Sequence, residues 1–452
     1  MKNLLGLIFA FSLVVGCSEE TAEPKRPNIL LIVADDLGYT DIGAYGGEIR
    51  TPNLDALAGD GLLLTNFYAA PTCSPTRAMM LSGTDYHLAG LGTMSGEWDT
   101  NQKGKRGYET YLNKDVVSVS SILQDSGYHT YMAGKWHLGY TPDLQPQSRG
   151  FEKSFALLQG GASHFSDRLG LVKGMAADYI ENGEVAELPS DFYSSNNYTD
   201  KMISYIEEGR DDSKPFFGYI AYTAPHWPLQ APEEDIDLYK GQYDKGYSEI
   251  RQERISRLKE LGIFDDQAIA SMAPPYIDAW DQLSPEQQKI EAREMEIFAA
   301  MVENLDRNIG RVINYLKDTD QYENTFILFM SDNGAEGNDI GDLSTNAEWI
   351  EEELDNSLDN MGKVNSYVYY GINWAHTGVG PFQNIKSFVS EGGIKVPSIV
   401  RYGGLSYKGD MDQTLMTVKD IAPTLLELAG TTHPGNQYKG NEVYPITGRS
   451  IL

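Results

Sequence analysis

The apolar residues of this chain fall into short continuous runs, separated by longer segments in which they recur at helical spacing. Asn28–Val33 is apolar after its first residue, and Phe216–Tyr222 and Thr325–Met330 have the same character. Continuous apolar runs of this length are typical of strands that are buried on both faces of a parallel sheet. Two more strands are predicted at Leu62–Tyr68 and Tyr128–Ala133.

The segments between these runs predict helices. Thr51-Pro52 is typical of a helix start, a capping residue followed by a first-turn proline, and Gly59 ends the apolar periodicity that follows. Three other helices are predicted at Val117–Asp125, Gln287–Leu316 and Ile421–Ala429. Because strands alternate with helices, we expect an α/β fold whose large, mixed but mainly parallel sheet carries helices on both faces.

Polar side chains follow four of the predicted strands within a few residues. Parallel strands end at one edge of their sheet, and the ligands of such folds bind beyond that edge. The sequence therefore predicts a polar site there, formed by Asp35-Asp36, by Lys135 and His137, by His226, and by Asp332-Asn333.

Two segments interrupt the alternation of strands and helices. Glu233–Asp281 is highly charged, and Asp339–Gly371 is acidic with few apolar residues. We interpret both as insertions at the surface or at the rim of a cleft. Plain solvated helices and loops would have the same composition.

The charge of the chain is unusual. Its 452 residues include 36 basic and 65 acidic side chains, which give a net charge of −29. Nucleic acid is thereby excluded as the main partner, because phosphate binding requires a basic surface. An acidic protein that handles an anion must instead concentrate positive charge at one place.

The N-terminus predicts export. Lys2 precedes the apolar run Leu4–Val15, which is shorter than the roughly 20 residues needed to span a bilayer. The run ends in Leu13–Cys17, which resembles the lipobox of bacterial lipoproteins and implies cleavage before a lipidated Cys17. An ordinary cleaved signal peptide is the alternative. We therefore expect a signal peptide at 1–16, a tether at 17–26 and the folded domain at 27–452, in the periplasm or anchored to the outer membrane.

Cys73 is the second of only two cysteines, and with Cys17 lipidated it has no partner for a disulfide. Pro75 lies near the start of a predicted helix, so Cys73 is close to the positive end of the helix dipole, with Arg77 one turn on. These neighbours favour an anion at residue 73. The residues alone leave both a reactive thiolate and a structural cysteine open.

The run Cys73-Ser74-Pro75-Thr76-Arg77 resembles the maturation signature of the type I sulfatases. Further blocks of the chain resemble the same family in the same order, and together they cover nearly everything after residue 26. These blocks are Pro27–Leu30 with Asp35–Gly38, Leu81–Thr84, Gly134–Gly139, Ala224–Pro228, Ser331–Gly334, and Lys386 with Glu391–Pro397.

The resemblance implies an alkaline-phosphatase-like fold and the hydrolysis of sulfate esters. In this family a maturation enzyme oxidises the cysteine, here Cys73, to formylglycine, and a hydroxyl of the hydrated aldehyde attacks sulfur. Such enzymes usually end in a small antiparallel sheet, so the resemblance also implies that this C-terminal part is missing or truncated here. As alternatives we keep a phosphatase or phosphonate monoester hydrolase of the same superfamily, and a surface lipoprotein that binds sulfated glycans without cleaving them.

The predicted metal ligands are all oxygen donors: Asp35, Asp36, Asp332 and Asn333. Hard ligands of this kind favour calcium or magnesium over zinc. The resemblance implies one Ca²⁺ ion, which an oxygen of the matured residue 73 and the substrate sulfate would also bind.

Five cationic or titratable side chains complete the predicted site: Arg77, Lys135, His137, His226 and Lys386. By resemblance, Arg77 orients the nucleophile, Lys135 binds sulfate oxygens and His137 accepts a proton. His226 and Lys386 would face the ester oxygen, and one of them would protonate the leaving alcohol. The acidic insertions would repel densely sulfated polymers, so we expect small aryl or alkyl sulfates as substrates.

Overall fold

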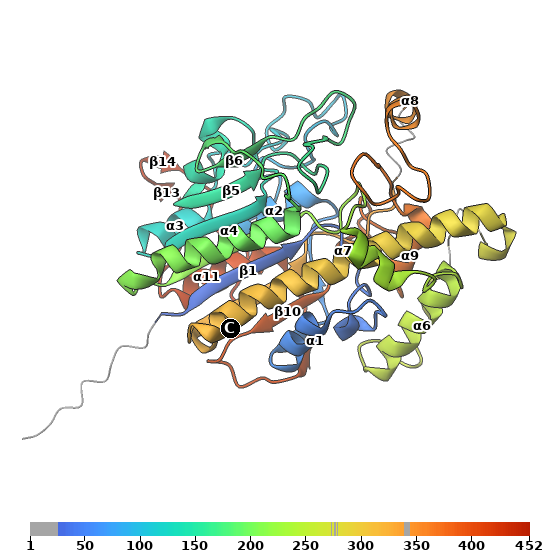
Figure 1. Cartoon of the computed structure of the whole chain (residues 1–452). Coiled ribbons are helices and arrows are strands. Elements are labelled where there is room, and N and C mark those ends of the chain that lie inside the picture. Colours follow the sequence, from blue (N-terminus) through green and yellow to red (C-terminus); the bar gives the residue numbers. More distant parts are fainter. Residues whose placement is uncertain (1–25, 273, 275–276, 278, 339–343) are drawn as a thin grey trace, which may run out of the picture.

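The computed structural model describes residues 26–272, 274, 277, 279–338 and 344–452, and Cys17 with the predicted signal peptide lies outside them. Its centre is a sheet that includes β1, β5, β6 and β10 (Figure 1). The sheet has ten strands in the order β11-β2-β10-β9-β1-β8-β4-β5-β6-β7. Five adjacent strands run parallel in its middle. They are β9 (Thr325–Ser331), β1 (Asn28–Ala34), β8 (Phe216–Ala221), β4 (His129–Lys135) and β5 (Lys153–Leu157).

Shorter strands extend the sheet on both sides. β10 (Ser398–Arg401) pairs antiparallel with β9, and beyond it lie β2 (Leu62–Leu64) and β11 (Asp410–Asp412). At the other side β6 (Tyr179–Glu181) and β7 (Glu184–Val185) add two antiparallel strands. The predicted mixed, mainly parallel sheet is confirmed.

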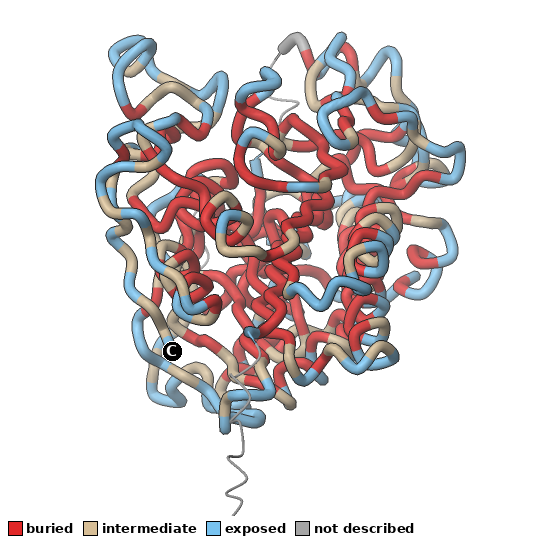
Figure 2. The backbone as a smooth tube through the Cα atoms, turned by 90° about the vertical axis from the view of Figure 1, so that its left-hand side faces the viewer, coloured by how far each residue is buried: buried red, intermediate tan, exposed pale blue. Residues whose placement is uncertain are grey.

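Helices cover both faces of the sheet, as the alternation of elements predicts. Leu30 and Ile32 of β1 pack into one core, while Ile29 and Leu31 pack into the other. The first core is covered by α1 (Pro52–Gly59), α4 (Ser194–Gly209), α6 (Tyr247–Glu260), α7 (Pro285–Asp318) and α9 (Gly371–Gly378). The second is covered by α2 (Cys73–Ser82), α3 (Val119–Asp125) and α11 (Ile421–Leu428). Figure 2 shows the buried residues concentrated in the middle of the molecule.

A local sequence signal explains where the longest helix begins. The long helix α7 begins at a complete capping box, in which Ser284 and Gln287 bond each other's backbone, with Pro285 as its first residue. The remaining short helices are α5 (Glu233–Ile236), α8 (Ser344–Glu353) and α10 (Glu391–Ile394). No helix among the described residues combines the length and the apolarity that crossing a bilayer requires.

The prediction of one strand over Leu62–Tyr68 is wrong. The chain turns at Thr65 and Asn66, whose backbones bond to the 412–416 segment. β2 therefore ends at Leu64, and β3 (Phe67–Tyr68) pairs with β12 (Met416–Thr417) in a separate two-stranded sheet. A third small sheet, antiparallel, joins β13 (Gln437–Tyr438) to β14 (Asn441–Glu442).

The prediction that the two charged segments lie at the surface is also wrong in part. Tyr243, Tyr247 and Leu258 of the first segment are buried in the core, as is Tyr367 of the second. Arg254 is fully buried and forms ion pairs with Asp41 and Glu48. A buried ion pair satisfies a charge that composition alone assigns to solvent. Residues 339–343 of the second segment lie outside the described residues.

Candidate active site

The carboxyl ends of the parallel strands bring the predicted site residues together. Asp35 and Asp36 follow β1, Lys135 is the last residue of β4, and Asp332 follows β9. Cys73 enters from the first turn of α2 on one face. His226 lies on the loop after β8, and Lys386 comes from the loop that precedes α10.

The turn after β1 directs two consecutive carboxylates into the same site. Asp36 has a φ of 67°, the left-handed conformation that aspartate tolerates better than most residues. Its backbone N–H donates to Oδ1 of Asp332 at 3.3 Å, and the next N–H, of Leu37, donates to Oγ of Ser331 at 3.0 Å. The ends of β1 and β9 are thereby tied to each other.

Four side chains form a potential metal centre. The ligand atoms of Asp35, Asp36, Cys73 and Asp332 all lie within 4.8 Å of one another, and all four residues are buried. Asn333 lies beside them, and its Oδ1 is buried without a hydrogen-bond partner, while its Nδ2 donates to Oδ1 of Asp36 at 2.6 Å. Three carboxylates and an orphan amide oxygen fit a hard divalent cation.

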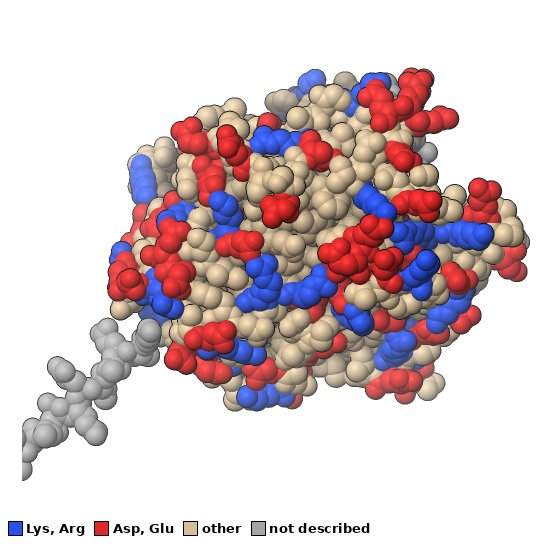
Figure 3. All heavy atoms as spheres, viewed as in Figure 1, with Lys and Arg blue, Asp and Glu red and all other residues tan. Residues whose placement is uncertain are grey.

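Three cations neutralise these carboxylates. Nζ of Lys135 lies 2.7 and 2.9 Å from the two oxygens of Asp35. Nζ of Lys386 lies 2.8 Å from Oδ1 of Asp36. Arg77 is fully buried and donates through Nε and Nη2 to Oδ2 of Asp332, at 3.0 and 2.7 Å. The cationic side chains that an acidic protein needs for an anion therefore lie inside the molecule, where carboxylates balance their charge, whereas acidic and basic side chains are interspersed on the face drawn in Figure 3.

Burial sets the protonation of the site. It raises the pKa of Asp35 to about 8, although Lys135 opposes the rise. Burial acts in the same direction on Asp36, but Lys386 and His226 hold its pKa below the usual value. Burial also raises the pKa of the Cys73 thiol. The thiolate that the helix start and Arg77 favour in the sequence is therefore disfavoured in the folded chain, because burial outweighs the nearby cations.

The two histidines differ in their surroundings. Nε2 of His226 lies 3.5 Å from Oδ2 of Asp36, and its Nδ1 lies 2.5 Å from the backbone oxygen of Trp227. His137 retains some exposure, while its Nδ1 is buried without a partner. Burial lowers the pKa of both rings well below the usual value, and Lys135 and Arg77 add to this effect at His137.

Two polar contacts of the site were missed in the sequence. Oε2 of Glu336 lies 2.8 Å from Nζ of Lys386, and the phenol oxygen of Tyr219 lies 3.2 Å from Nη1 of Arg77. Glu336 stands three residues after Asn333, and that proximity was an available signal. Tyr219 lies within an apolar strand, where the pattern indicates only burial.

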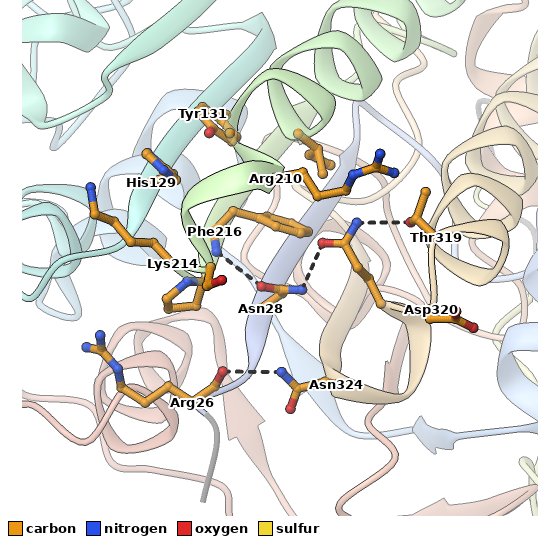
Figure 4. Close-up of a pocket in the computed structure, with 15 residues that line it drawn as sticks. Arg26, Asn28, His129, Tyr131, Arg210, Lys214, Phe216, Thr319, Asp320 and Asn324 are labelled. Atoms are coloured by element: carbon orange, nitrogen blue, oxygen red, sulfur yellow. Dashed lines mark hydrogen bonds between the residues drawn. The ribbon is translucent and has the colours of Figure 1, made fainter. Parts of the chain in front are cut away.

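A hollow lies at the amino edge of the sheet, opposite the candidate active site (Figure 4). Its volume is about 500 Å³, and its lining includes Asn28, His129, Arg210, Lys214 and Asp320. Lys214 pairs with Asp212, and Arg210 pairs with Glu207, in ion pairs whose members are about half exposed. None of the predicted site residues lines this hollow, so it is separate from the candidate active site.

The chain belongs to the sulfatase family, whose family model matches residues 27–431. It is a sulfuric ester hydrolase with the alkaline-phosphatase-like fold that the sequence predicts. The arylsulfatase of Klebsiella aerogenes is 40% identical over 99% of this chain and 96% of its own length. A sulfatase of Schizosaccharomyces pombe is 46% identical over 95% of this chain and 79% of its own. A crystal structure of Ps i-CgsB with a bound neocarrahexaose superposes with a TM-score of 0.64 at 26% identity, covering 92% of this chain and 75% of the other.

Proposed function

We propose that this sulfatase hydrolyses aryl or alkyl sulfates with a formylglycine made from Cys73 and with one bound calcium ion. The position of Cys73 carries the proposal. Its Sγ lies 3.9 Å from Oδ1 of Asp36, inside the cluster of carboxylates and cations, on the first residue of a helix. It is a free cysteine whose burial keeps it protonated, so the thiol itself is a poor nucleophile. Oxidation by a separate maturation enzyme would replace it by an oxygen nucleophile.

The residues that would hold calcium are Asp35, Asp36, Asp332 and Asn333, together with residue 73. When bound, the ion would polarise a sulfate oxygen and offset negative charge in the transition state. Only oxygen ligands are available among these four, which favours calcium over zinc. Four oxygen donors favour a sulfatase over the phosphatase and phosphonate hydrolase alternatives, whose sites commonly contain histidine ligands, although His226 also lies within ligand distance of Asp35 and Cys73.

The cations of the site divide the work on the substrate. Lys135, at the end of β4, would bind the sulfate oxygens. Arg77 is bonded to Asp332, and this bond holds the helix turn that carries residue 73 in place. His137 has a free, buried Nδ1 and a low pKa, so it is neutral and suited to accept a proton. Lys386 is held between the carboxylates of Asp36 and Glu336, which raise its pKa despite burial.

The leaving alcohol requires a proton donor, and the sequence leaves His226 and Lys386 open. We assign this role to His226. Lys386 is bonded to two carboxylates that favour its charged form, so it acts better as a fixed charge than as an acid. Burial lowers the pKa of His226, but its Nε2 faces the carboxylate of Asp36, which opposes that fall, and a bound sulfate ester, being an anion, would favour the protonated ring further.

The preference for aryl or alkyl alcohols rests on the similarity to the Klebsiella arylsulfatase over nearly the whole chain. The test compares the hydrolysis of p-nitrophenyl sulfate with that of sulfated oligosaccharides. Faster release of sulfate from the oligosaccharides would contradict the preference. Hydrolysis of p-nitrophenyl phosphate that exceeds that of the sulfate would favour the phosphatase alternative.

Intact-mass analysis tests the nucleophile. Protein produced with a formylglycine-generating enzyme should be lighter than the unmodified chain by the mass difference between cysteine and formylglycine at residue 73. Only the lighter form should release sulfate. Removal of calcium with EGTA should abolish sulfate release, and calcium should restore it. An active protein that retains the thiol at residue 73 would contradict the proposal.

We also propose that the protein is exported and anchored by a lipid on Cys17. The support is the sequence alone: a short apolar run that ends in a lipobox-like motif. Metabolic labelling with a palmitate analogue tests the anchor. Loss of label in the Cys17→Ser variant is the expected result, and a cleaved, unlabelled protein would favour an ordinary signal peptide.

A further inference from the structure

His164 is a buried histidine outside the predicted site, and both of its ring nitrogens are bonded. It exposes only 1% of its surface. Its Nε2 lies 3.0 Å from the backbone carbonyl oxygen of His226, and its Nδ1 lies 2.7 Å from Oγ of Ser194. A carbonyl oxygen only accepts, so Nε2 carries the proton and Nδ1 accepts from the Ser194 hydroxyl.

The bond to the carbonyl of residue 226 bears directly on the orientation of the His226 ring. Nδ1 of His226 donates to the next carbonyl, that of Trp227, at 2.5 Å, which leaves Nε2 facing Asp36. The two carbonyls belong to consecutive peptide groups. A rotation of the peptide after residue 226 would move the Trp227 carbonyl, and the imidazole would follow it.

A second connection joins the same two segments. Oε1 of Gln230 accepts from the backbone N–H of His164 at 2.8 Å and from Oγ of Ser163 at 2.9 Å. Gln230 also donates through Nε2 to the carbonyl of Ser366 at 3.0 Å. A Cβ on Gly161 would lie 3.1 Å from Nδ1 of His226, so the backbone before His164 packs directly on the imidazole.

We propose that His164 is a positioning residue for His226, and that it holds the imidazole in the orientation that protonates the leaving alcohol. This inference rests on the proposed function. As the nucleophile's oxygen bonds to sulfur, the S–O bond to the alcohol breaks and its electron pair stays on the departing oxygen. In the protonated ring, Nδ1 donates to the Trp227 carbonyl and Nε2 carries the second proton, which passes to the departing oxygen and leaves the ring neutral. A histidine that is poorly oriented fails most at esters whose alcohol is most basic, because these leave slowly without a proton.

The experiment measures kcat/KM for three aryl sulfates of increasing phenol basicity: p-nitrophenyl, phenyl and p-methoxyphenyl sulfate. The matured, calcium-loaded enzyme is compared with H164N, whose shorter amide can still bond Ser194 but ends short of the His226 carbonyl. We expect H164N to lose less than about 3-fold on the nitrophenyl ester and about 10- to 100-fold on the methoxyphenyl ester, part of the 10²- to 10⁴-fold that general acids contribute. H164Q, whose longer amide reaches the carbonyl, should restore most of the loss.

A double-mutant cycle separates positioning from general damage. If His164 acts through His226, H164N should cost little further activity in an H226A background. The matched control is H129N, because His129 also bonds two side chains, Glu152 and Asp212, but at the amino edge of the sheet. It should leave the dependence on the leaving group unchanged.

Two outcomes would overturn the inference: an equal loss of kcat/KM on all three esters in H164N, or the full loss repeated in the H226A background. If H164N fails to fold, Ser194→Ala replaces it, because it removes the hydroxyl that bonds Nδ1 of His164. A steeper leaving-group dependence than the parent would then support the inference, whereas an equal loss on all esters would reject it. Failure of the proposed function looks different, because the parent enzyme would then release no sulfate from any ester.

Discussion

Both edges of the central sheet carry pairs of oppositely charged side chains, but the pairs are buried at one edge and exposed to solvent at the other. At the carboxyl edge, Asp35 and Lys135 pair with no exposed surface, as do Arg77 and Asp332. At the amino edge, Lys214 and Asp212 pair with about half of each side chain in solvent. Charges interact far more strongly in the low-dielectric interior than in water, where exposed pairs contribute only about 0–1 kcal/mol. Fully buried charge therefore distinguishes the candidate active site from the hollow at the amino edge.

Helix ends add to the contrast. The N-terminus of α2 carries Cys73 into the carboxyl edge, where its partial positive charge favours an anionic substrate. Gly209 and Thr319, at the C-terminal ends of α4 and α7, line the hollow at the amino edge instead. Those ends carry partial negative charge. The helix ends therefore favour an anion at the carboxyl edge and a cation at the amino edge, although Arg210 and Lys214 also line the hollow there.

The largest effect is expected at the nucleophile. Cys73→Ala should lower kcat by at least about 10⁴-fold, since loss of a nucleophile removes the chemical step itself. The unfolding free energy should change by only about 1 kcal/mol, because few buried atoms are lost. Sulfate release and urea denaturation measure the two quantities. Ser213→Ala, at the amino edge, is the control that should retain full activity, and a C73A enzyme with appreciable turnover would remove Cys73 from the mechanism.

A smaller effect is expected at the carboxylate that holds Lys386. Glu336→Gln removes one of the two charges on Nζ of Lys386, and a hydrogen bond to a charged group contributes about 1.5–3 kcal/mol, so kcat/KM should fall by about 10-fold or more. Glu323→Gln is the matched control, because Glu323 bonds Arg401 but its side chain is 78% exposed. Equal effects of both variants on kcat/KM would contradict the distinction between the two edges.

The unfolding free energy should depend on pH in part through the titration of His164. Burial lowers its pKa to about 4. The unfolded chain binds a proton there below about pH 6.5, and the folded chain does so only below about pH 4, so this stabilisation is complete above pH 6.5 and is lost as the pH falls through 4. About 3 kcal/mol should disappear over that window. Urea denaturation of H164Q should show a shallower slope than the parent by this amount, because His137, His226 and His376, whose pKa values burial also lowers, keep their own contributions. An unchanged slope would show that His164 contributes nothing to it.

The smallest effects are expected at the amino edge. Lys214→Ala and Arg210→Ala each remove a half-exposed ion pair, so the unfolding free energy should change by no more than about 0.5 kcal/mol. Their kcat/KM for p-nitrophenyl sulfate should equal that of the parent. A loss of more than about 5-fold in either variant would show that the hollow takes part in the reaction and would break the comparison.

The sequence by itself determined the strands that matter and the residues that follow them. Continuous apolar runs fixed β1, β8 and β9, because a strand buried on both faces leaves no position for a polar residue. The chain then has to turn at the sheet edge, which is why Asp35, His226 and Asp332 could be placed together without coordinates. The family resemblance added Lys386, whose position no local pattern indicates, and it decided between the reactive and the structural interpretation of Cys73 that the local pattern left open.

Only the tertiary structure decided the protonation states of the site residues and the hydrogen bonds that hold them in position. Residues distant in sequence, such as Asp36 and Lys386, form ion pairs, and burial determines how strongly each partner shifts the pKa of the other. The linear pattern does not indicate whether a polar side chain is buried. The same limit hid the turn that ends β2 at Leu64 and the bond from His164 to His226. The turn and the hydrogen bond both depend on residues from distant segments that the packed sheet brings close, and the sequence of one segment does not indicate which residues these are.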